Sequence, residues 1–275
     1  MQHFPSRTQQ QGLSLIELLV GLTIGLLTIA VAVGSLLISR QVANSVSEAS
    51  QLQQQAADAF RIIGQQVRQA GSVRLNLAFA KDSTQTIDYA DPVAFEMPPD
   101  FDKRADTISG HTAPSASEYR LALAYQNYTE NLVGSAAAQS QLRDCLGQAP
   151  SNSIIRSGFV LNKAAGATSG ELQCAGSSGQ RQALIANVAD FQVRFIEQAN
   201  ATSGSPTMQY RTADSVVSWP EVYAVEVCLE MEGAENLPDM GAQYVNCANQ
   251  SVARGTRLRM VYRNTYQIRS QGLPS

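Results

Sequence analysis

The sequence predicts an α+β protein in which one long N-terminal helix precedes a body of antiparallel β-strands. Apolar residues fill positions 13–39, and the pattern that follows keeps helical spacing to residue 70 without a proline. After Gly71, short β-rich segments alternate with stretches rich in Ser, Gly, Asn and Pro, and no second helical pattern of comparable length follows. Such a pattern is typical of antiparallel sheets with one face on a core.

The composition limits the classes of function. The 275 residues are 44% hydrophobic and 16% charged, with 20 Lys and Arg against 23 Asp and Glu, giving a net charge of −3. This balance provides material for a sizeable core and argues against a strongly basic nucleic-acid binder or an acidic disordered chain. Because the chain has two histidines, a His-rich metal centre is not expected, and we predict neither a metal nor a cofactor.

Residues 13–39 contain a single ionisable side chain, that of Glu17. As a helix this segment would span about 40 Å, whereas the hydrocarbon core of a bilayer is about 30 Å thick. A secretory signal cut after Ala32 is one interpretation, but such signals have apolar runs of about 7–15 residues. A plain signal anchor is another, but it gives no reason for a charge that costs about 2.5–3.5 kcal/mol at the centre of a membrane.

The run Gly12-Leu13-Ser14-Leu15-Ile16-Glu17-Leu18-Leu19-Val20 resembles the processing signature of type IV prepilins. The resemblance implies that a prepilin peptidase cuts between Gly12 and Leu13 on the cytoplasmic face and that the new amine of Leu13 is methylated. It also implies that Glu17 accepts the amine of a neighbouring subunit and so sets the register between helices. Leu13 differs from the family, which usually has Phe or Met at this position. The difference weakens the expectation of methylation more than that of cleavage.

Three glycines interrupt the apolar helix. Gly21 and Gly25 form a G-x-x-x-G pattern, which permits close approach of two helices but also occurs by chance in membrane segments. Gly34 lies where many pilins carry a residue that weakens the helix, and glycine costs about 1 kcal/mol relative to alanine in a helix. We expect all three to act in helix packing or in local melting during assembly.

Residues 40–71 are predicted to continue the helix in amphipathic form. Arg61, Gln65 and Arg68 would occupy the polar side, and Gly71 provides a stop. A free coiled coil is the alternative for this part, but at most three heptads and a glutamine-rich surface argue against it. The apolar stripe expected to pack on the body comprises Leu52, Ala56, Ala59, Phe60, Ile63, Val67 and Ala70.

Residues 72–275 are predicted to form a β-rich globular domain whose sheet covers that stripe. Period-two alternation is clearest at 191–195 and 223–229. Loops are expected at 98–116, 164–170 and 198–206. The predicted strands are 93–97, 119–128, 154–162, 191–197, 222–230 and 257–268.

Four cysteines lie in this region, at Cys145, Cys174, Cys228 and Cys247, and none forms a C-x-x-C pair. On the exported side of a membrane protein they indicate two disulfides. Three connectivities are possible, of which we expect the nearest-neighbour pairs Cys145–Cys174 and Cys228–Cys247. Each would close a loop of roughly 20–30 residues, a contribution of about 3–4 kcal/mol in the chain-entropy account.

The chain as a whole resembles the PilW-type minor pilins, more loosely than its N-terminus resembles prepilins. The resemblance implies a pilin-like lollipop, in which a long helix packs on a sheet, and a low-abundance subunit that helps initiate assembly near the filament tip. Its implied partners are other minor pilins, the major pilin and a large pilus-tip adhesin. The segments that carry the resemblance are AADAFRIIGQQVRQAG at 56–71, DCLG at 144–147, LQC at 172–174, LIANVADFQVRF at 184–195, WPEV at 219–222 and YRN at 262–264.

No catalytic arrangement is apparent in the sequence. Asp100, Asp102 and Asp106 lie in one loop, but Lys103 and Arg104 intervene and no glycine turn suits a calcium loop. His111 is solitary, and neither G-x-S-x-G nor a phosphate loop occurs. We therefore predict that the protein is not an enzyme.

Five arginines follow Asp239 near the C-terminus without an acidic residue between them. A DNA-binding edge would use such residues against phosphate, and a subunit contact could use them as well. Cross-strand pairing with the glutamates near 226–235 is the interpretation that we prefer, so nucleic acid is not expected as a partner. The arginines are Arg254, Arg257, Arg259, Arg263 and Arg269.

These observations predict a leader at 1–12, a transmembrane and filament-core helix at 13–39, an amphipathic continuation at 40–71 and a periplasmic domain at 72–275. The predicted function is that of a minor type IV pilin acting in pilus biogenesis, motility and adhesion. It would lie in the inner membrane before assembly and at the cell surface afterwards. The alternatives are a minor pseudopilin of type II secretion, a pilus-borne adhesin or DNA-binding module, and a membrane-anchored enzyme.

Overall fold

The computed structural model describes most of the chain, which clusters into two compact units, Met1–Glu48 and Ala49–Ser275. The predicted leader apart from Gly12, the methylation position Leu13 and most of the predicted loop at 198–206 lie outside the described residues. The described residues are 12, 14–76, 94–96, 98–131, 133–134, 138–199, 207–238 and 241–269.

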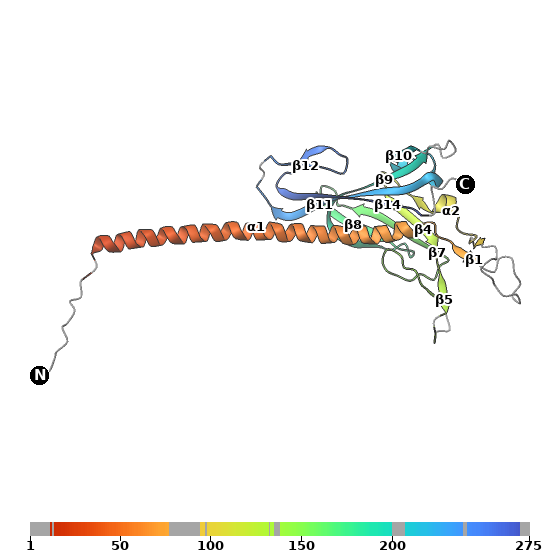
Figure 1. The fold of residues 1–275 in the computed structure, drawn as a ribbon, viewed down its shortest axis with the longest axis horizontal. Helices are drawn as coiled ribbons and strands as arrows, with labels where there is room; N and C mark the ends of the chain where they lie inside the picture. The colour runs from red at the N-terminus through yellow and green to blue at the C-terminus, as the bar shows by residue number, and fades with distance from the viewer. Residues whose placement is uncertain are drawn as a thin grey trace. The chain divides into compact units, whose positions relative to one another are not determined.

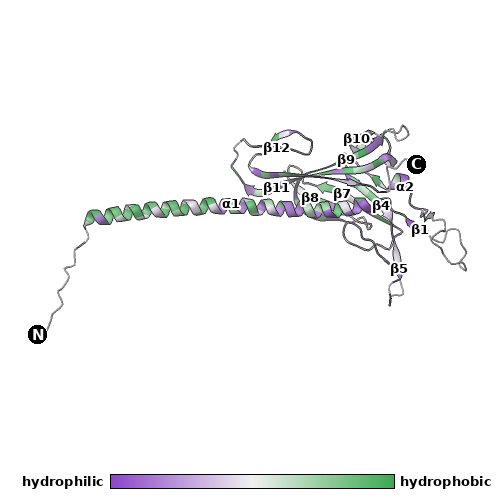
Figure 2. Cartoon of the chain, viewed as in Figure 1, coloured by the Kyte–Doolittle hydropathy of each residue, from purple (hydrophilic) through white to green (hydrophobic). Residues whose placement is uncertain are grey.

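Helix α1 runs without a break from Leu15 to Gln69, a length of 55 residues (Figure 1). Its first part is almost uniformly hydrophobic, whereas polar residues alternate with apolar ones in its last turns (Figure 2). Gly71, with φ of 69°, ends the helix in the left-handed conformation that glycine adopts without strain. The predicted long helix is therefore present as one element.

The body contains an antiparallel sheet of eight strands in the order β14-β11-β9-β8-β7-β4-β3, with β10 paired to β9 (Figure 1). Its strands are β3 (Ile108–Ser109), β4 (Leu121–Gln126), β7 (Ile154–Asn162), β8 (Gly170–Ala175), β9 (Arg181–Ala199), β10 (Thr207–Arg211), β11 (Val222–Asn236) and β14 (Arg257–Gln267). The mixed α+β class, with a long N-terminal helix and an antiparallel sheet, agrees with the prediction.

Shorter elements surround this sheet. Three two-stranded ribbons pair β1 (Arg74–Asn76) with β2 (Ala94–Glu96), β5 (Thr129–Asn131) with β6 (Ala138–Ser140), and β12 (Gln243–Val245) with β13 (Ser251–Ala253). The helical turns are α2 (Lys103–Asp106), η2 (Ala213–Ser215) and η3 (Trp219–Glu221).

The predictions about strands and loops were incomplete at three places. Strand β8 was not predicted, although Leu172 and Cys174 alternate into the core, because its short segment was interpreted as a cysteine motif beside a loop. The predicted loop at 98–116 contains α2, which Asp102 caps by accepting a hydrogen bond from the Arg104 N–H at 2.9 Å. A predicted strand at 191–197 is the second half of β9, which has 19 residues.

The core of the body forms between one face of the sheet and the end of α1. Alternate residues of β9 and β11 face this core, including Phe191, Phe195 and Leu229, each 0% exposed. The compact unit therefore begins at Ala49 and not after the helix. The helix residues in the core are Leu52, Ala56, Ala59, Ile63, Val67 and Ala70, and Phe60 of the predicted stripe is partly buried against it.

Gln66 is a buried polar residue on this otherwise apolar face. Its Oε1 accepts hydrogen bonds from the hydroxyls of Tyr125 and Ser157, both at 2.9 Å, and its Nε2 donates to the carbonyl of Arg143 at 3.2 Å. The amide therefore joins α1 to β4, β7 and the segment before Cys145. A buried polar group with all its partners fixes the position of the helix along the sheet.

At Gly64, α1 lies close to the sheet. A Cβ at this position would collide with the ring of Tyr266 on β14. The Tyr266 hydroxyl also donates to the carbonyl of Phe60 at 2.7 Å. Glycine at position 64 thus makes room for a tyrosine that links the last strand to the helix.

Replacing Gln66 with Ala should lower the free energy of unfolding by about 1–3 kcal/mol, because the buried Ser157 hydroxyl loses its acceptor. Urea denaturation of the full chain in detergent, followed by the fluorescence of the single tryptophan, Trp219, measures this. Gln65→Ala, at the neighbouring exposed position, is the control and should have little effect. Equal stability of the two variants would contradict the role of Gln66.

The Gly64→Ala substitution should destabilise the chain although alanine favours helix, because its methyl group meets the Tyr266 ring. In a Tyr266→Ala background the same substitution should become neutral or stabilising. A double-mutant cycle of denaturation midpoints measures this coupling. Additive effects of the two substitutions would show that the contact is unimportant.

Candidate functional site

The first turn of α1 places Glu17 three residues after the cap of the helix. The Glu17 N–H donates to the Ser14 hydroxyl at 3.3 Å and to the Ser14 carbonyl at 3.1 Å. Ser14 and Glu17 thus have the S-x-x-E spacing of a capping box. A carboxylate in the first turn is also favoured by the helix dipole, so the helix itself accommodates the charge at this end.

The helix surface around Glu17 is apolar and exposed in this chain. Leu15, Ile16 and Leu18 are 59–79% exposed, and an 18-residue window of α1 has a mean hydropathy of 2.4. Among the described residues, α1 is the one helix long and apolar enough to cross a membrane. A surface of this kind needs lipid or other helices around it.

The three glycines of this segment are not explained by contacts within the described part of the chain. A Cβ at Gly21, Gly25 or Gly34 would meet nothing within 4 Å, in contrast to Gly64. Their proposed role in packing therefore concerns a neighbouring helix and stays a prediction.

At β11 and β14 the outer face of the sheet, opposite α1, is polar, and the β12–β13 ribbon lies against it. The disulfide between Cys228 and Cys247 joins β11 to this ribbon, with 5.7 Å between the Cα atoms. The Arg263 guanidinium donates to the carbonyls of Asn246 at 2.6 Å and Cys247 at 3.3 Å, and it lies 3.7 Å from the Glu226 carboxylate. These contacts tie the ribbon to the last two strands of the sheet.

A ladder of ion pairs continues along the same face. The Arg259 guanidinium lies 3.2 Å from the Glu230 carboxylate and also pairs with Glu232, while Arg257 lies 3.7 Å from Glu232. Glu230 and Glu232 are buried, so the arginines compensate charges that would be costly alone. The predicted cross-strand pairing is confirmed for three of the arginines, and their guanidinium groups are engaged within the fold.

The second disulfide stabilises the turn after β6. Cys145 pairs with Cys174 of β8, with 6.3 Å between the Cα atoms. The buried carboxylate of Asp144 accepts hydrogen bonds from the N–H groups of Leu146 and Gln148 at 3.0 Å and of Ser177 at 3.1 Å. The segment at 144–147 is thereby explained as a structural turn.

Two groups of acids that resemble metal sites have other partners. The Asp100 carboxylate accepts a hydrogen bond from the Ser153 hydroxyl. In the turn of α2, the Asp102 carboxylate accepts from the N–H of Arg104, and the Asp106 carboxylate accepts from the N–H of Asp102. Asp190, Glu230 and Cys247 place ligand atoms within 4.8 Å of one another. However, the sulfur of Cys247 is in a disulfide, and Glu230 accepts hydrogen bonds from Tyr244 and Arg259.

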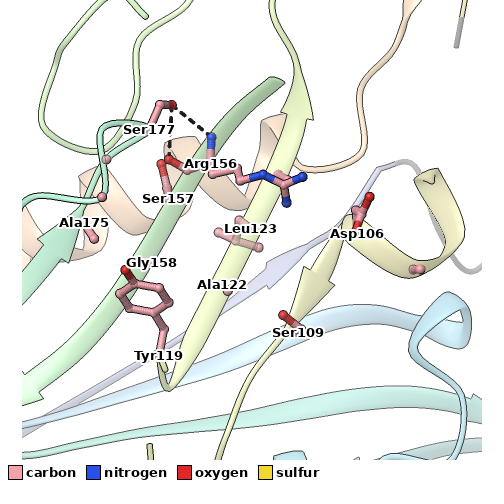
Figure 3. Close-up of a pocket in the computed structure, with 14 residues that line it drawn as sticks. Asp106, Ser109, Tyr119, Ala122, Leu123, Arg156, Ser157, Gly158, Ala175 and Ser177 are labelled. Carbon is pink, nitrogen blue, oxygen red and sulfur yellow. Dashed lines mark hydrogen bonds between the residues drawn. The ribbon is translucent and has the colours of Figure 1, made fainter. Parts of the chain in front are cut away.

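A pocket of about 290 Å³ lies over β4 and β7 (Figure 3). Small residues form much of its wall, and Gly158 leaves room for the ring of Tyr119 beside it. Asp106 and Arg156 are the acidic and basic side chains in its lining. The Ser157 hydroxyl donates to Gln66, and the Ser177 hydroxyl contacts the backbone of Arg156. The described lining residues therefore form no pair of nucleophile and base.

An apolar N-terminal helix whose last turns pack in the core of an antiparallel sheet agrees with the arrangement expected from the predicted resemblance to pilins. Residues 159–270 match the family model described as Type IV Pilus-assembly protein W. This match supports a PilW-like type IV pilin and confirms the predicted resemblance. It contains the segments at 172–174, 184–195, 219–222 and 262–264, covers less than half of the chain and does not reach α1.

A type IV-like pilin from Thermus thermophilus is 12% identical over 60% of this chain and 83% of its own, with a TM-score of 0.29. Such a low score carries no argument about the fold. A comparison with curated protein sequences finds no significant match.

The structure explains two of the segments in the matched region. Trp219, in the turn that leads into β11, packs edge-on against Phe195 with ring centroids 4.9 Å apart. Arg263 in the YRN segment forms the bonds to the β12–β13 ribbon described above. The WPEV segment thus contacts β9 at the start of β11, and the YRN segment joins β14 to the β12–β13 ribbon.

The tyrosine of the β12–β13 ribbon should make stability sensitive to alkaline pH. Burial and the hydrogen bond to Glu230 raise the pKa of Tyr244 to about 12, against about 10 in an unfolded chain. The neutral form is favoured by folding, so this contribution is complete below pH 10 and is lost as pH rises from about 10 to about 12.

We expect Tyr244→Phe to flatten the fall of the urea midpoint between pH 10 and pH 12, relative to the unsubstituted chain. Tyr210→Phe, at an exposed position on β10, is the control and should leave that slope unchanged. An identical slope for Tyr244→Phe and the unsubstituted chain would contradict the assignment.

Proposed function

We propose that this protein is a minor type IV pilin that helps to initiate pilus assembly and lies in the filament at or near its tip. The observation that carries the proposal is a single acid, Glu17, in the first turn of an exposed apolar helix. The Gly12–Leu13 bond shortly before this helix resembles a prepilin cleavage site. The PilW match in the body supports the same conclusion independently, since it does not include that helix.

Processing prepares the helix for assembly in this proposal. A prepilin peptidase removes residues 1–12 at the cytoplasmic face of the inner membrane, and the amine of Leu13 is methylated. The remaining helix stays in the bilayer with the body in the periplasm. Assembly then transfers the helix from lipid to a bundle of other pilin helices at the centre of the filament.

Glu17 provides the register of that bundle. Its carboxylate pairs with the cationic amine of a neighbouring subunit, because an unpaired charge among apolar side chains would be costly. The capping of the first turn by Ser14 holds the backbone at Glu17 in helical geometry. Gly21 and Gly25 would allow close approach of the adjacent helix, and Gly34 is a place where the helix could extend.

The body supplies the contacts that distinguish this subunit from others. We infer that its partners are other minor pilins, the major pilin and a tip adhesin, with roles in motility and adhesion. The PilW match favours a pilus over a type II secretion pseudopilus. Engagement of Arg257, Arg259 and Arg263 in ion pairs within the sheet argues against a DNA-binding module at this edge.

Mass spectrometry of the N-terminal peptide, taken from protein extracted from membranes, tests the proposed processing. We expect a chain that starts at Leu13, with or without one methyl group. A chain that keeps Met1, or one that starts after Ala32, would overturn the proposal that this is a processed pilin.

The Glu17→Gln substitution tests the register. The neutral amide has nearly the same shape but cannot form the ion pair, so we expect at least about tenfold fewer filaments, in line with the cost of leaving one buried charge unpaired. Glu171→Gln, at an exposed position of the body, is the control. Normal filament numbers with Glu17→Gln, at equal protein level, would rule out this role.

A further inference from the structure

A cavity of about 280 Å³ lies on the outer face of the sheet, away from α1. Its floor is the segment Gln192–Arg194 of β9, where Gln192 and Arg194 alternate with core residues. Its walls come from His111, Thr112 and Arg120 before β4, from Thr212 and Ala213, and from Ala248 in the turn between β12 and β13. Four separate parts of the chain thus enclose it.

Two guanidinium groups belong to this lining, and neither has an acidic partner within 4 Å among the described residues. Arg120 and Arg194 form no side-chain hydrogen bond or ion pair within 4 Å to another described residue. The Nε of Arg120 is fully buried without a hydrogen-bond partner, and so is the hydroxyl oxygen of Thr112 in the same wall. Burial lowers the pKa of Arg120, which reflects the cost of removing its charge from water.

The acids nearby do not compensate these cations directly. Asp190 and Asp214 act on Arg120 only at longer range, and the Asp190 carboxylate already accepts from the N–H of Phe191 at 2.9 Å and from Gln192 at 2.7 Å. Glu226 faces Arg194 across the strands but lies 3.7 Å from Arg263.

The remaining titratable group in the lining is His111. Its Nδ1 lies 3.8 Å from the Glu118 carboxylate. His111 therefore has an acidic group within 4 Å, whereas the two arginines have none among the described residues. Partly buried donors without acceptors are rare in folded proteins, and guanidinium groups are well suited to bind the oxygens of carboxylates and phosphates.

We propose that this cavity binds a small oxyanion, a carboxylate or phosphate group, between Arg120 and Arg194, with the Thr112 hydroxyl as a further donor. The anion would accept the hydrogen bonds that the fold leaves open and would join β9 to the segment before β4 and to the β12–β13 ribbon. This site is separate from the helix on which assembly is proposed to depend, so its test does not bear on that proposal.

Isothermal titration calorimetry of the full chain in a non-ionic detergent tests the site, with inorganic phosphate and acetate as separate probes at constant ionic strength. We expect saturable binding of at least one of the two, and the preferred probe identifies the anion class. Arg120→Gln and Arg194→Gln should each weaken binding at least about tenfold, because each removes charged hydrogen bonds. Arg156→Gln, an exposed arginine outside the cavity, should leave binding unchanged.

Absence of saturable binding by both probes would overturn the proposal, as would equal affinity of the unsubstituted chain and the Arg194→Gln variant. Circular dichroism checks that each variant is folded. Because Arg194 is only partly buried and forms no close pair with a described residue, its substitution decides the test if Arg120→Gln does not fold.

Discussion

A single continuous helix has to satisfy two different environments, and the rest of the structure depends on this. Its first half is apolar on every side, with one carboxylate in the first turn. Its last turns expose a polar face and bury a stripe of small and branched side chains in the core of a sheet. Because no break separates the two parts, the helix that is proposed to carry the subunit in a membrane or filament is also a structural part of the body.

The junction between helix and sheet is specified by polar and steric features as well as by apolar burial. Apolar contact alone allows a helix to slide by a turn with little loss, since burial is non-directional. The Gln66 network and the contact of Gly64 with Tyr266 each permit one position. A force transmitted along α1 would therefore reach β4, β7 and β14 through defined side chains.

The outer face of the sheet is stabilised by ion pairs and a disulfide and not by contact with the helix. Here β11 carries buried glutamates that are neutralised by arginines of β14. The Cys228–Cys247 disulfide and the hydrogen bonds of Arg263 hold a two-stranded ribbon over them. The same enclosure creates the cavity at Arg120 and Arg194, where the compensation is incomplete. The body thus has a dry apolar face for the helix and a charged, covered face on the other side.

Local patterns in the sequence predicted most of the fold. The stripe from Leu52 to Ala70, the strand at 154–162 and the pairing of β11 with β14 follow from periodicity and charge placement over short distances. The assembly role of Glu17 came from the resemblance to prepilins and stays a prediction. The S-x-x-E spacing at Ser14 was a visible signal that was not used.

Features that depend on distant parts of the chain were missed. Gln66 interrupts an apolar stripe, and its partners Tyr125 and Ser157 lie 59 and 91 residues away, so its burial has no local signature. Arg120 directly precedes β4 and Arg194 lies in β9, and these two strands are not neighbours in the sheet. The cavity between the two arginines needs the β12–β13 ribbon as well. Strand β8 was missed because six residues with one cysteine give too short a pattern to distinguish from a loop.

The central claim is that the Glu17 carboxylate meets the amine of an adjoining subunit. Zero-length carbodiimide cross-linking of intact filaments, followed by mass spectrometry, measures this contact directly. The account predicts a peptide containing Glu17 joined to the N-terminal residue of another subunit, and no such product from a Glu17→Gln chain. Filaments that contain the protein but yield Glu17 only in unlinked peptides, while other subunit contacts are cross-linked, would contradict it.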